Sequence, residues 1–430
     1  MNAETIDQNV EPNTTGSPNP PSTFKGKLKM VGPGFVTAAT GVGTGDLIAA
    51  LVAGAGFGTT LIWAIIVGSI FKFFFTEGMG RWQLATGNTI LEGFHSLGKW
   101  ATGYFGIYSV LWGLSYGAAA MSTSAIMMVT MFPIMPLWAW AILHGLAGMA
   151  LVLTGKYKLF ERVMTVMIGV MFITVVGSAV ILVPDIGNII SGLVPRTGDG
   201  SLLLVMGLLG GVGGTITMAS YGYWIRENKW EGKKWVPMMK LDSAVGYVIT
   251  AIFTVSLLVV GAEFLFGTGI EINGEEGLVT LSNLFSEEFG ELARWMFLIG
   301  AWCAAFSSLL GVWNGVPYLF ADFVRIVRNK GKRSDKPVSE KDPAYRAYLL
   351  WLTFPPMLLL FFGKPVFLVI LYGALGALFM PFLALTLMWL LNSNRVDAGF
   401  KNGWIANTVL TCCVLLFGYL GIIELIDMFG

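Results

Sequence analysis

Apolar stretches of about 20 residues follow one another along most of the 430-residue chain. A helix of about 20 apolar residues spans the hydrocarbon core of a bilayer. With 55% hydrophobic and only 12% charged residues, the chain has too little polar surface for a soluble globule. The sequence therefore predicts an all-α polytopic membrane protein with about 11 transmembrane helices, at approximately 31–55, 60–80, 104–131, 137–154, 160–183, 202–225, 243–267, 293–322, 346–362, 366–392 and 404–427.

Basic residues between these stretches indicate the orientation, because Lys and Arg accumulate on the cytoplasmic side. With a cytoplasmic N-terminus, all but three of the 27 basic residues lie inside, Lys72 and Arg81 among them. The exceptions are Arg196, Arg294 and Lys364. We therefore expect the N-terminus in the cytoplasm and the C-terminus outside, and a short chain of this kind is compatible with a bacterial inner (plasma) membrane. Residues 1–24, rich in Asn, Pro, Ser and Thr, are expected to be a disordered tail.

Several classes of function are excluded by composition. A net charge of +1 leaves no basic excess with which to bind nucleic acid. The cysteines Cys303, Cys412 and Cys413 lie in apolar stretches without metal-ligand spacing, so disulfides and zinc sites are not expected. The chain holds two histidines, no acidic or histidine cluster, no nucleophile motif and no phosphate loop. We therefore expect neither an enzyme nor a bound cofactor.

The first apolar stretch contains Gly41-Val42-Gly43-Thr44-Gly45-Asp46. Glycines at alternate positions weaken a helix by about 1 kcal/mol each, so this span is expected to break into two half-helices near mid-membrane. A break frees backbone carbonyls and amides, which together with the Asp46 carboxylate form a candidate cation site. In the alternative interpretation, Asp46 caps the second half-helix and binds nothing. The two roles are compatible.

Five spans later the same disturbance recurs in Gly207-Leu208-Leu209-Gly210-Gly211-Val212-Gly213-Gly214-Thr215-Ile216-Thr217-Met218-Ala219-Ser220-Tyr221. Matched interruptions in spans 1 and 6 indicate two inverted five-helix repeats with substrate held between the breaks. The repeats are expected at about 30–183 and 202–392, within a transporter core at 25–392, and 393–430 adds helix 11. Alternatively, glycines of this kind form a close helix-packing face.

Scaffold motifs over about residues 30–425 resemble the natural-resistance-associated macrophage protein family of divalent-metal transporters. They are Gly32-Pro33-Gly34-Phe35, Ala53-Gly54-Ala55-Gly56-Phe57-Gly58, Ala85-Thr86-Gly87, Pro136-Leu137-Trp138 and Pro381-Phe382. The resemblance implies the LeuT-type fold, in the amino acid–polyamine–organocation superfamily, and alternating access. It identifies the chain as similar to the divergent branches of that family.

The resemblance also implies a site, with departures. The family's span-1 Asp-Pro-Gly-Asn aligns with Gly43-Thr44-Gly45-Asp46, so one carboxylate remains but is shifted by three residues. The span-6 Ala-x-x-Met-Pro-His aligns with Thr215-Ile216-Thr217-Met218-Ala219-Ser220, which keeps the Met and loses the His. A thioether favours softer metals, although with 21 methionines in the chain Met218 is equally well explained by packing. The candidate binding residues are Asp46, Met218, Gly43, Thr44, Thr215, Thr217 and Ser220.

Groups that carry protons in the family are also missing. Ala118 and Met121 stand about where span 3 of the family has acids, and Ser220 does not titrate near neutral pH. The leading hypothesis is a secondary transporter or facilitator of Mn, Fe or a similar divalent ion, or Mg, without proton coupling. A small organic cation or amino acid bound through Asp46 is the alternative substrate, and a non-transporting sensor or scaffold is a minor one. A monomer is favoured.

Other polar residues near span ends are candidates for gates or pathway residues. Glu77 and Arg81, one helical turn apart, are expected to pair with each other. Arg226, Glu227 and Asp242 are expected at the interface, Glu263 near the outer entrance and Tyr221 along the pathway. His144 is expected to be packed and hydrogen-bonded. The glutamate-rich segment 271–291 is expected to be an outside loop.

Overall fold

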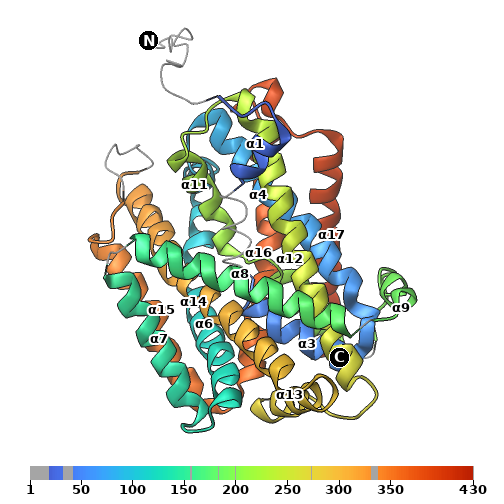
Figure 1. Ribbon diagram of the computed structural model, residues 1–430. Coiled ribbons are helices and arrows are strands. Elements are labelled where there is room, and N and C mark those ends of the chain that lie inside the picture. Colours follow the sequence, from blue (N-terminus) through green and yellow to red (C-terminus); the bar gives the residue numbers. More distant parts are fainter. Residues whose placement is uncertain are drawn as a thin grey trace, which may run out of the picture.

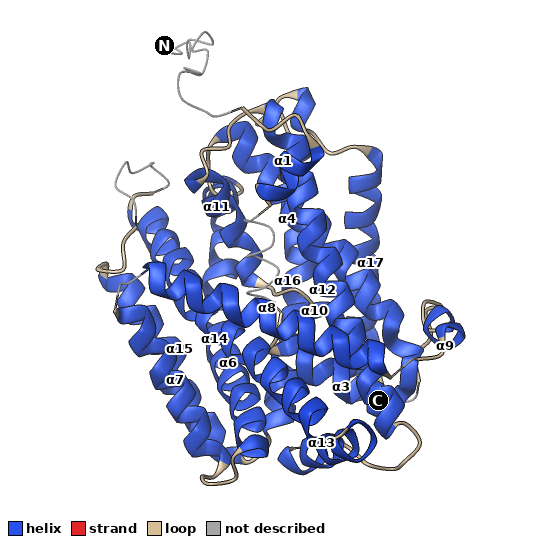
Figure 2. Cartoon of the chain, viewed as in Figure 1, coloured by secondary structure: helices blue, strands red, loops and turns tan. Residues whose placement is uncertain are grey.

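The computed structural model describes residues 19–31, 42–154, 157–182, 184–198, 200–272, 274–330 and 338–429. All regular structure in these ranges is helical, and no strand is drawn among them (Figure 2). Most of the expected N-terminal tail, the first half of span 1 and the motif Gly32-Pro33-Gly34-Phe35 lie outside the described residues.

The helices follow the predicted apolar stretches. In chain order they are α1 (Phe24–Lys29), α3 (Gly45–Phe57), α4 (Ile62–Thr86), α5 (Ile90–Ser96), α6 (Lys99–Met131), α7 (Leu137–Leu153), α8 (Tyr157–Ile181), α9 (Ile186–Ser191), α10 (Leu202–Gly211), α11 (Tyr221–Glu227), α12 (Val236–Leu265), α13 (Glu275–Phe289), α14 (Glu291–Arg328), α15 (Pro343–Leu359), α16 (Pro365–Asn392) and α17 (Trp404–Phe429). Short 3₁₀ segments are η1 (Gly58–Leu61), η2 (Ile216–Ser220), η3 (Lys233–Trp235), η4 (Leu360–Phe362) and η5 (Ala398–Phe400).

Nine helical segments of the described chain are long and apolar enough to cross a membrane, judged by length and composition. One of them, Gly45–Thr86, is 42 residues long and combines the second half of predicted span 1 with span 2. The apolar helix α7 is shorter than the others. All-helical architecture is thus confirmed, whereas the number of crossings and their direction remain predictions.

Two sequence expectations are wrong. The segment 271–291 is not simply a loop, because α13 occupies most of it and packs Leu278, Leu281 and Phe285 into the core. Lys72 does not lie at a cytoplasmic span end. It sits in the middle of α4 with no exposed surface, so it does not contribute to the charge bias on the inside.

The core surrounds α3, the second half of span 1. This helix packs against α10, α12 and α16, while α14 packs against α6 and α8 on the other side of the bundle (Figure 1). Helices α1 and α11 lie at one end of the molecule and α13 at the other. The breaks before α3 and after α10 therefore meet inside the bundle, away from both ends.

The predicted break in span 6 is present. Helix α10 ends at Gly211, residues 212–215 leave the helical path, and the chain resumes as η2 and α11. Gly213 and Gly214 have φ of 69° and 84°, a left-handed conformation that glycine adopts without a Cβ clash. For span 1, α3 starts at Gly45 after the non-helical residues 42–44, as expected for the second of two half-helices.

Helices α3 and α12 approach each other through a glycine pair. A Cβ placed on Gly54 would lie 2.1 Å from the Leu258 carbonyl oxygen, and one on Gly261 would lie 2.4 Å from that of Leu51. Small residues of this kind allow backbones to come close, which drives association within a bilayer. In these two helices the glycines form a packing face, as the alternative interpretation of such residues anticipates.

We expect Gly54→Ala to lower the thermal stability of the purified protein. Alanine gains about 1 kcal/mol in helix propensity over glycine. Its methyl group would collide with a backbone oxygen, and overpacking of this sort costs about 1–3 kcal/mol. The matched control is Gly56→Ala in the same helix, where a Cβ meets nothing within 4 Å. Equal melting temperatures for the two variants would contradict the close approach.

Candidate substrate site at the two helix breaks

Asp46 is the carboxylate at the meeting point of the two breaks. It lies in the first turn of α3 and is 1% exposed. The Gly213 amide, freed by the break in span 6, donates to its Oδ2 atom at 3.2 Å. Among the described residues its Oδ1 atom has no hydrogen-bond partner, and the position of a Cβ on Gly211 is 3.9 Å away. Asp46 thus joins span 1 to span 6 and keeps one buried acceptor available.

The capping interpretation of Asp46 is not supported by this geometry. The cap residue of α3 is Thr44, and its side chain makes no capping hydrogen bond. Asp46 follows the cap by two residues, where a negative charge still interacts favourably with the helix dipole. Its carboxylate nevertheless reaches across to the other broken helix.

Lys72 is a buried residue at the site that the sequence reasoning missed. Its ammonium donates to the carbonyl oxygens of Gly210, at 2.9 Å, and Gly214. It also interacts electrostatically with Asp46. A signal was available: Lys72 lies well inside the apolar stretch 60–80, too far from the nearer end to be a flanking charge.

Aromatic rings close the site from two sides. A Cβ on Gly45 would lie 2.9 Å from the ring of Tyr372 in α16, and one on Gly213 would lie 2.8 Å from the ring of Tyr247 in α12. The hydroxyl groups of Tyr247 and Thr76 are 2.8 Å apart. Glycines at these points let the broken backbones lie directly against the rings, so the space beside Asp46 is small.

Thr44 and Gly43, predicted to bind substrate, have structural contacts. The Thr44 hydroxyl lies 3.3 Å from that of Tyr116 in α6 and donates to Ser308 in α14 at 3.2 Å, while Tyr116 and Ser308 lie 2.9 Å apart. The three hydroxyl groups fasten the start of α3 to spans 3 and 8. Gly43 has φ of 128°, and a Cβ there would lie 2.1 Å from the Ala304 carbonyl oxygen. Gly43 therefore provides a close contact with α14.

The span-6 candidates all lie in or beside η2 and are buried. Met218 lies in η2 and has no exposed surface. Thr217 has a hydroxyl without a hydrogen-bond partner. Ser220 faces α14, because a Cβ on Gly315 would lie 3.9 Å from its Oγ atom. The Thr215 methyl group faces α16, 2.7 Å from a Cβ on Gly376. These four residues are close in sequence, but their side chains point in several directions.

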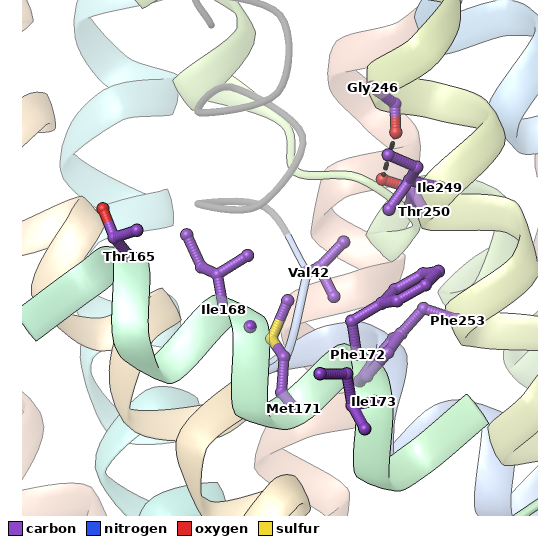
Figure 3. Close-up of a pocket in the computed structure, with 11 residues that line it drawn as sticks. Val42, Thr165, Ile168, Met171, Phe172, Ile173, Gly246, Ile249, Thr250 and Phe253 are labelled. Atoms are coloured by element: carbon purple, nitrogen blue, oxygen red, sulfur yellow. Dashed lines mark hydrogen bonds between the residues drawn. The ribbon is translucent and has the colours of Figure 1, made fainter. Parts of the chain in front are cut away.

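A cavity of about 340 Å³ lies beside the break in span 1. Val42 lies between side chains of α8, among them Ile168 and Met171, and side chains of α12, among them Phe253 (Figure 3). Thr250 lines it too, but its hydroxyl donates to the Gly246 carbonyl at 3.1 Å. The wall is apolar, so this cavity offers no ligand set for a metal ion.

The expected Glu77–Arg81 pair is present, with Arg81 Nε 2.7 Å from Glu77 Oε1. Lys240 of α12 lies 3.5 Å from the same oxygen. Arg81 also donates to the carbonyl oxygens of Phe400 and Lys401 and to the Asn402 side chain. The cluster links α4 to α12 and to the segment before α17.

Two tyrosines hold α11 in place. The Tyr221 hydroxyl donates to Asp242 of α12 at 2.8 Å, and that of Tyr223 donates to Asp322 of α14. Asp322 also accepts from Arg325 and, at 3.4 Å, from Thr89. Both aspartates have no exposed surface, and the position of Asp242 at the membrane interface stays a prediction. Sequence reasoning missed Asp322 because it stands at the end of a long apolar stretch.

The remaining candidates lie away from the breaks. Arg226 and Glu227 are exposed at the end of α11, and Glu263 is exposed near the end of α12. His144 is packed as expected: it lies 2.7 Å from the Trp140 carbonyl through Nδ1 and accepts from Trp302 through Nε2 at 2.9 Å. Among the described residues, no group of three or more His, Cys, Asp and Glu side chains is placed to hold a metal.

Comparisons with known proteins agree on the type of chain. A family model described as "Natural resistance-associated macrophage protein-like" matches residues 34–427. The divalent metal cation transporter MntH of Staphylococcus saprophyticus is 23% identical over 97% of this chain and 96% of its own length. An uncharacterised protein of Pasteurella multocida is 25% identical over 74% and 75%, respectively. A manganese transporter of Eremococcus coleocola, solved as a His-to-Ala mutant, superposes with a TM-score of 0.74 at 16% identity, over 95% of this chain and 88% of its own.

Proposed function

Since this chain belongs to the natural resistance-associated macrophage protein-like family of membrane transporters, we propose that it carries a divalent transition-metal ion across the membrane without coupling to protons. The observation that carries the proposal is the free Oδ1 atom of Asp46, buried where the two broken helices meet. A buried carboxylate acceptor beside backbone carbonyls is the arrangement by which interrupted transmembrane helices bind cations. The MntH relatives are named for the same type of substrate.

The residues around the site support the absence of proton coupling in this proposal. Ala118 and Met121 are both fully buried in α6, where the family's acids are expected, and neither titrates. Ser220, aligned with the family's His, is buried in η2 and stays neutral. No side chain of these three exchanges a proton in step with a metal ion. Mn²⁺ or Fe²⁺ suits a site in which the Met218 thioether joins the Asp46 carboxylate as a ligand, and Mg²⁺ suits the carboxylate alone.

Alternating access then requires one group of helices to move against the others, so that the site opens to each side of the membrane in turn. Tyr221 and Tyr223 fasten α11 to α12 and α14, and the ion pair between Lys240 and Glu77 fastens α4 to α12. These contacts bury charged and phenolic groups together, and we propose that they are the gate that opens toward the end of the molecule holding α1 and α11. Closure by specific polar contacts gives the closed state a defined geometry.

A second candidate substrate is a small amino acid or other zwitterion. The specific observation in its favour is Lys72, because an ammonium group in the break suits a substrate carboxylate while Asp46 suits a substrate amine. Competition separates the two candidate substrates. If the substrate is a zwitterion, excess glycine, alanine or proline would compete for its site. If the substrate is a metal ion, the same excess would leave Mn²⁺ binding to the purified protein unchanged.

Met218 is expected to set the preference among metals. A thioether is a soft ligand, so Met218→Ala should lower the affinity for Cd²⁺ about tenfold and that for Mg²⁺ less than twofold. Isothermal titration of purified protein with each ion measures both. Met206→Ala, in α10 and away from η2, is the control. An equal change for Cd²⁺ and Mg²⁺ would show that Met218 only packs.

A further inference from the structure

A lysine with no exposed surface lies at the centre of this transporter. Lys72 stands in the middle of the 25-residue helix α4, among apolar residues. Ionisable residues inside a membrane span are costly, and they are retained where they face a partner or a substrate path. Lys72 faces the break in span 6, and it is therefore a candidate for a residue that takes part in substrate binding.

The partners of Lys72 are groups that would otherwise attract a cation. Gly210 belongs to the last turn of α10, and Gly214 lies in the break itself. Carbonyl oxygens at the C-terminal end of a helix carry partial negative charge. Unwound carbonyls of this kind coordinate ions in transporters with interrupted helices. The ammonium therefore occupies a position suited to a cation. We call the two carbonyl oxygens, of Gly210 and Gly214, the carbonyl cradle.

Asp46 and Lys72 are held by the same short segment, which includes the last residues of α10 and the break after it. Residues 210–214 present two carbonyls to Lys72 and, through the Gly213 amide, one donor to Asp46. The free Oδ1 atom of Asp46 faces Gly211 of this segment. A metal ion bound at Oδ1 would thus lie beside the ammonium, and the two positive charges would repel each other strongly in a medium of low dielectric constant.

From this arrangement we propose that Lys72 is a tethered cation that competes with the transported ion. In the empty transporter its ammonium fills the carbonyl cradle and balances the charge of Asp46. A cation that binds at Asp46 pushes the ammonium out of the cradle and takes over the carbonyl oxygens. The inference rests on the proposed function and assigns a specificity-determining residue to it.

Two consequences follow from a tethered competitor. A monovalent ion offers the site no more charge than Lys72 already does, so displacement favours divalent ions over Na⁺ or K⁺. The empty site also stays neutral, since Lys72 returns to the cradle when the ion leaves. A neutral empty site reorients across the bilayer without picking up a proton. Lys72 thus supplies the neutralising charge in a chain that lacks the family's acids and histidine.

Mn²⁺ binding to the purified full-length protein tests this inference. Lys72→Gln keeps a donor for the carbonyls and removes the charge, Lys72→Met removes both, and Lys72→Arg keeps the charge. We expect Gln and Met to tighten Mn²⁺ binding about tenfold or more, because a repelling charge close to the ion is gone. Arg should stay within about threefold of wild type. Lys364→Gln, an exposed lysine far along the chain, is the control and should change nothing.

The outcomes separate this inference from the proposed function. Wild-type affinity in folded Lys72→Gln and Lys72→Met would overturn the tethered competitor and leave metal transport standing. Binding by these variants alone, with none by wild type, would support the competitor and overturn metal transport. Failure of Lys72→Gln and Lys72→Met to fold, with Lys72→Arg folded on gel filtration, would make Lys72 a structural residue and overturn the inference.

Discussion

Asp46→Asn is expected to lower Mn²⁺ uptake into proteoliposomes by about 100-fold or more. The amide keeps the size of the side chain and still accepts from the Gly213 amide, so the break in span 6 remains attached. The negative charge is lost from the buried carboxylate at the meeting point of the breaks. A divalent ion loses hydrating water when it enters a buried site, and a negative charge in the site must offset that loss. We therefore expect Mn²⁺ affinity and Mn²⁺ uptake to fall together.

The control for Asp46→Asn is Asp185→Asn. Asp185 is exposed at the start of α9, where it accepts from the Gly187 amide, and asparagine caps a helix about as well as aspartate. Uptake by this variant should match wild type. Wild-type uptake by Asp46→Asn, at equal amounts of reconstituted protein, would remove Asp46 from the site.

Gly43→Ala is expected to abolish folded protein rather than to weaken metal binding. A methyl group on Gly43 would lie 2.1 Å from the Ala304 carbonyl oxygen, and two backbones would have to separate to admit it. The φ of 128° adds strain, which for a residue other than glycine costs about 1–3 kcal/mol. Together these effects should exceed about 4 kcal/mol, the range reserved for severe defects. Loss of the monodisperse peak on gel filtration measures this.

Gly87→Ala separates the two causes. Gly87 also has a positive φ, 68°, at the end of α4, but a Cβ there meets nothing within 4 Å. This control carries the conformational strain without the collision, so it should cost about 1–2 kcal/mol and leave the protein folded. Comparable losses in the two variants would show that Gly43 matters for its φ alone and not for its contact with α14.

Much of the fold follows from the sequence because its signals are local. Apolar stretches near 20 residues can only be helices in a bilayer, and the glycine runs break the helices where they occur. The span-6 break between Gly211 and Ile216 confirms the second of these predictions. Helix α13 was missed because an amphipathic surface helix with many glutamates reads as a polar loop until its partner, α14, is known.

The site was less predictable because it depends on contacts between distant segments. Asp46 was found through its isolation as a charge in an apolar stretch. Lys72 carried the same signal, because it stands well inside the apolar stretch 60–80, but it was counted with the span-end charges. The structure places it in the middle of α4. Thr44 and Gly43 sit in the correct motif, yet their contacts with Ser308 and Ala304 arise from α14, more than 250 residues away in the chain.

The most direct test of the account is Mn²⁺ uptake by the wild-type protein in liposomes that contain both a metal-sensitive and a pH-sensitive dye. We predict saturable uptake down the Mn²⁺ gradient while internal pH stays constant, and no acceleration when an inward proton gradient is imposed. Acidification of the lumen in step with Mn²⁺ would contradict the uncoupled mechanism. No uptake of Mn²⁺, Fe²⁺, Cd²⁺ or Mg²⁺ above protein-free liposomes would contradict metal transport itself.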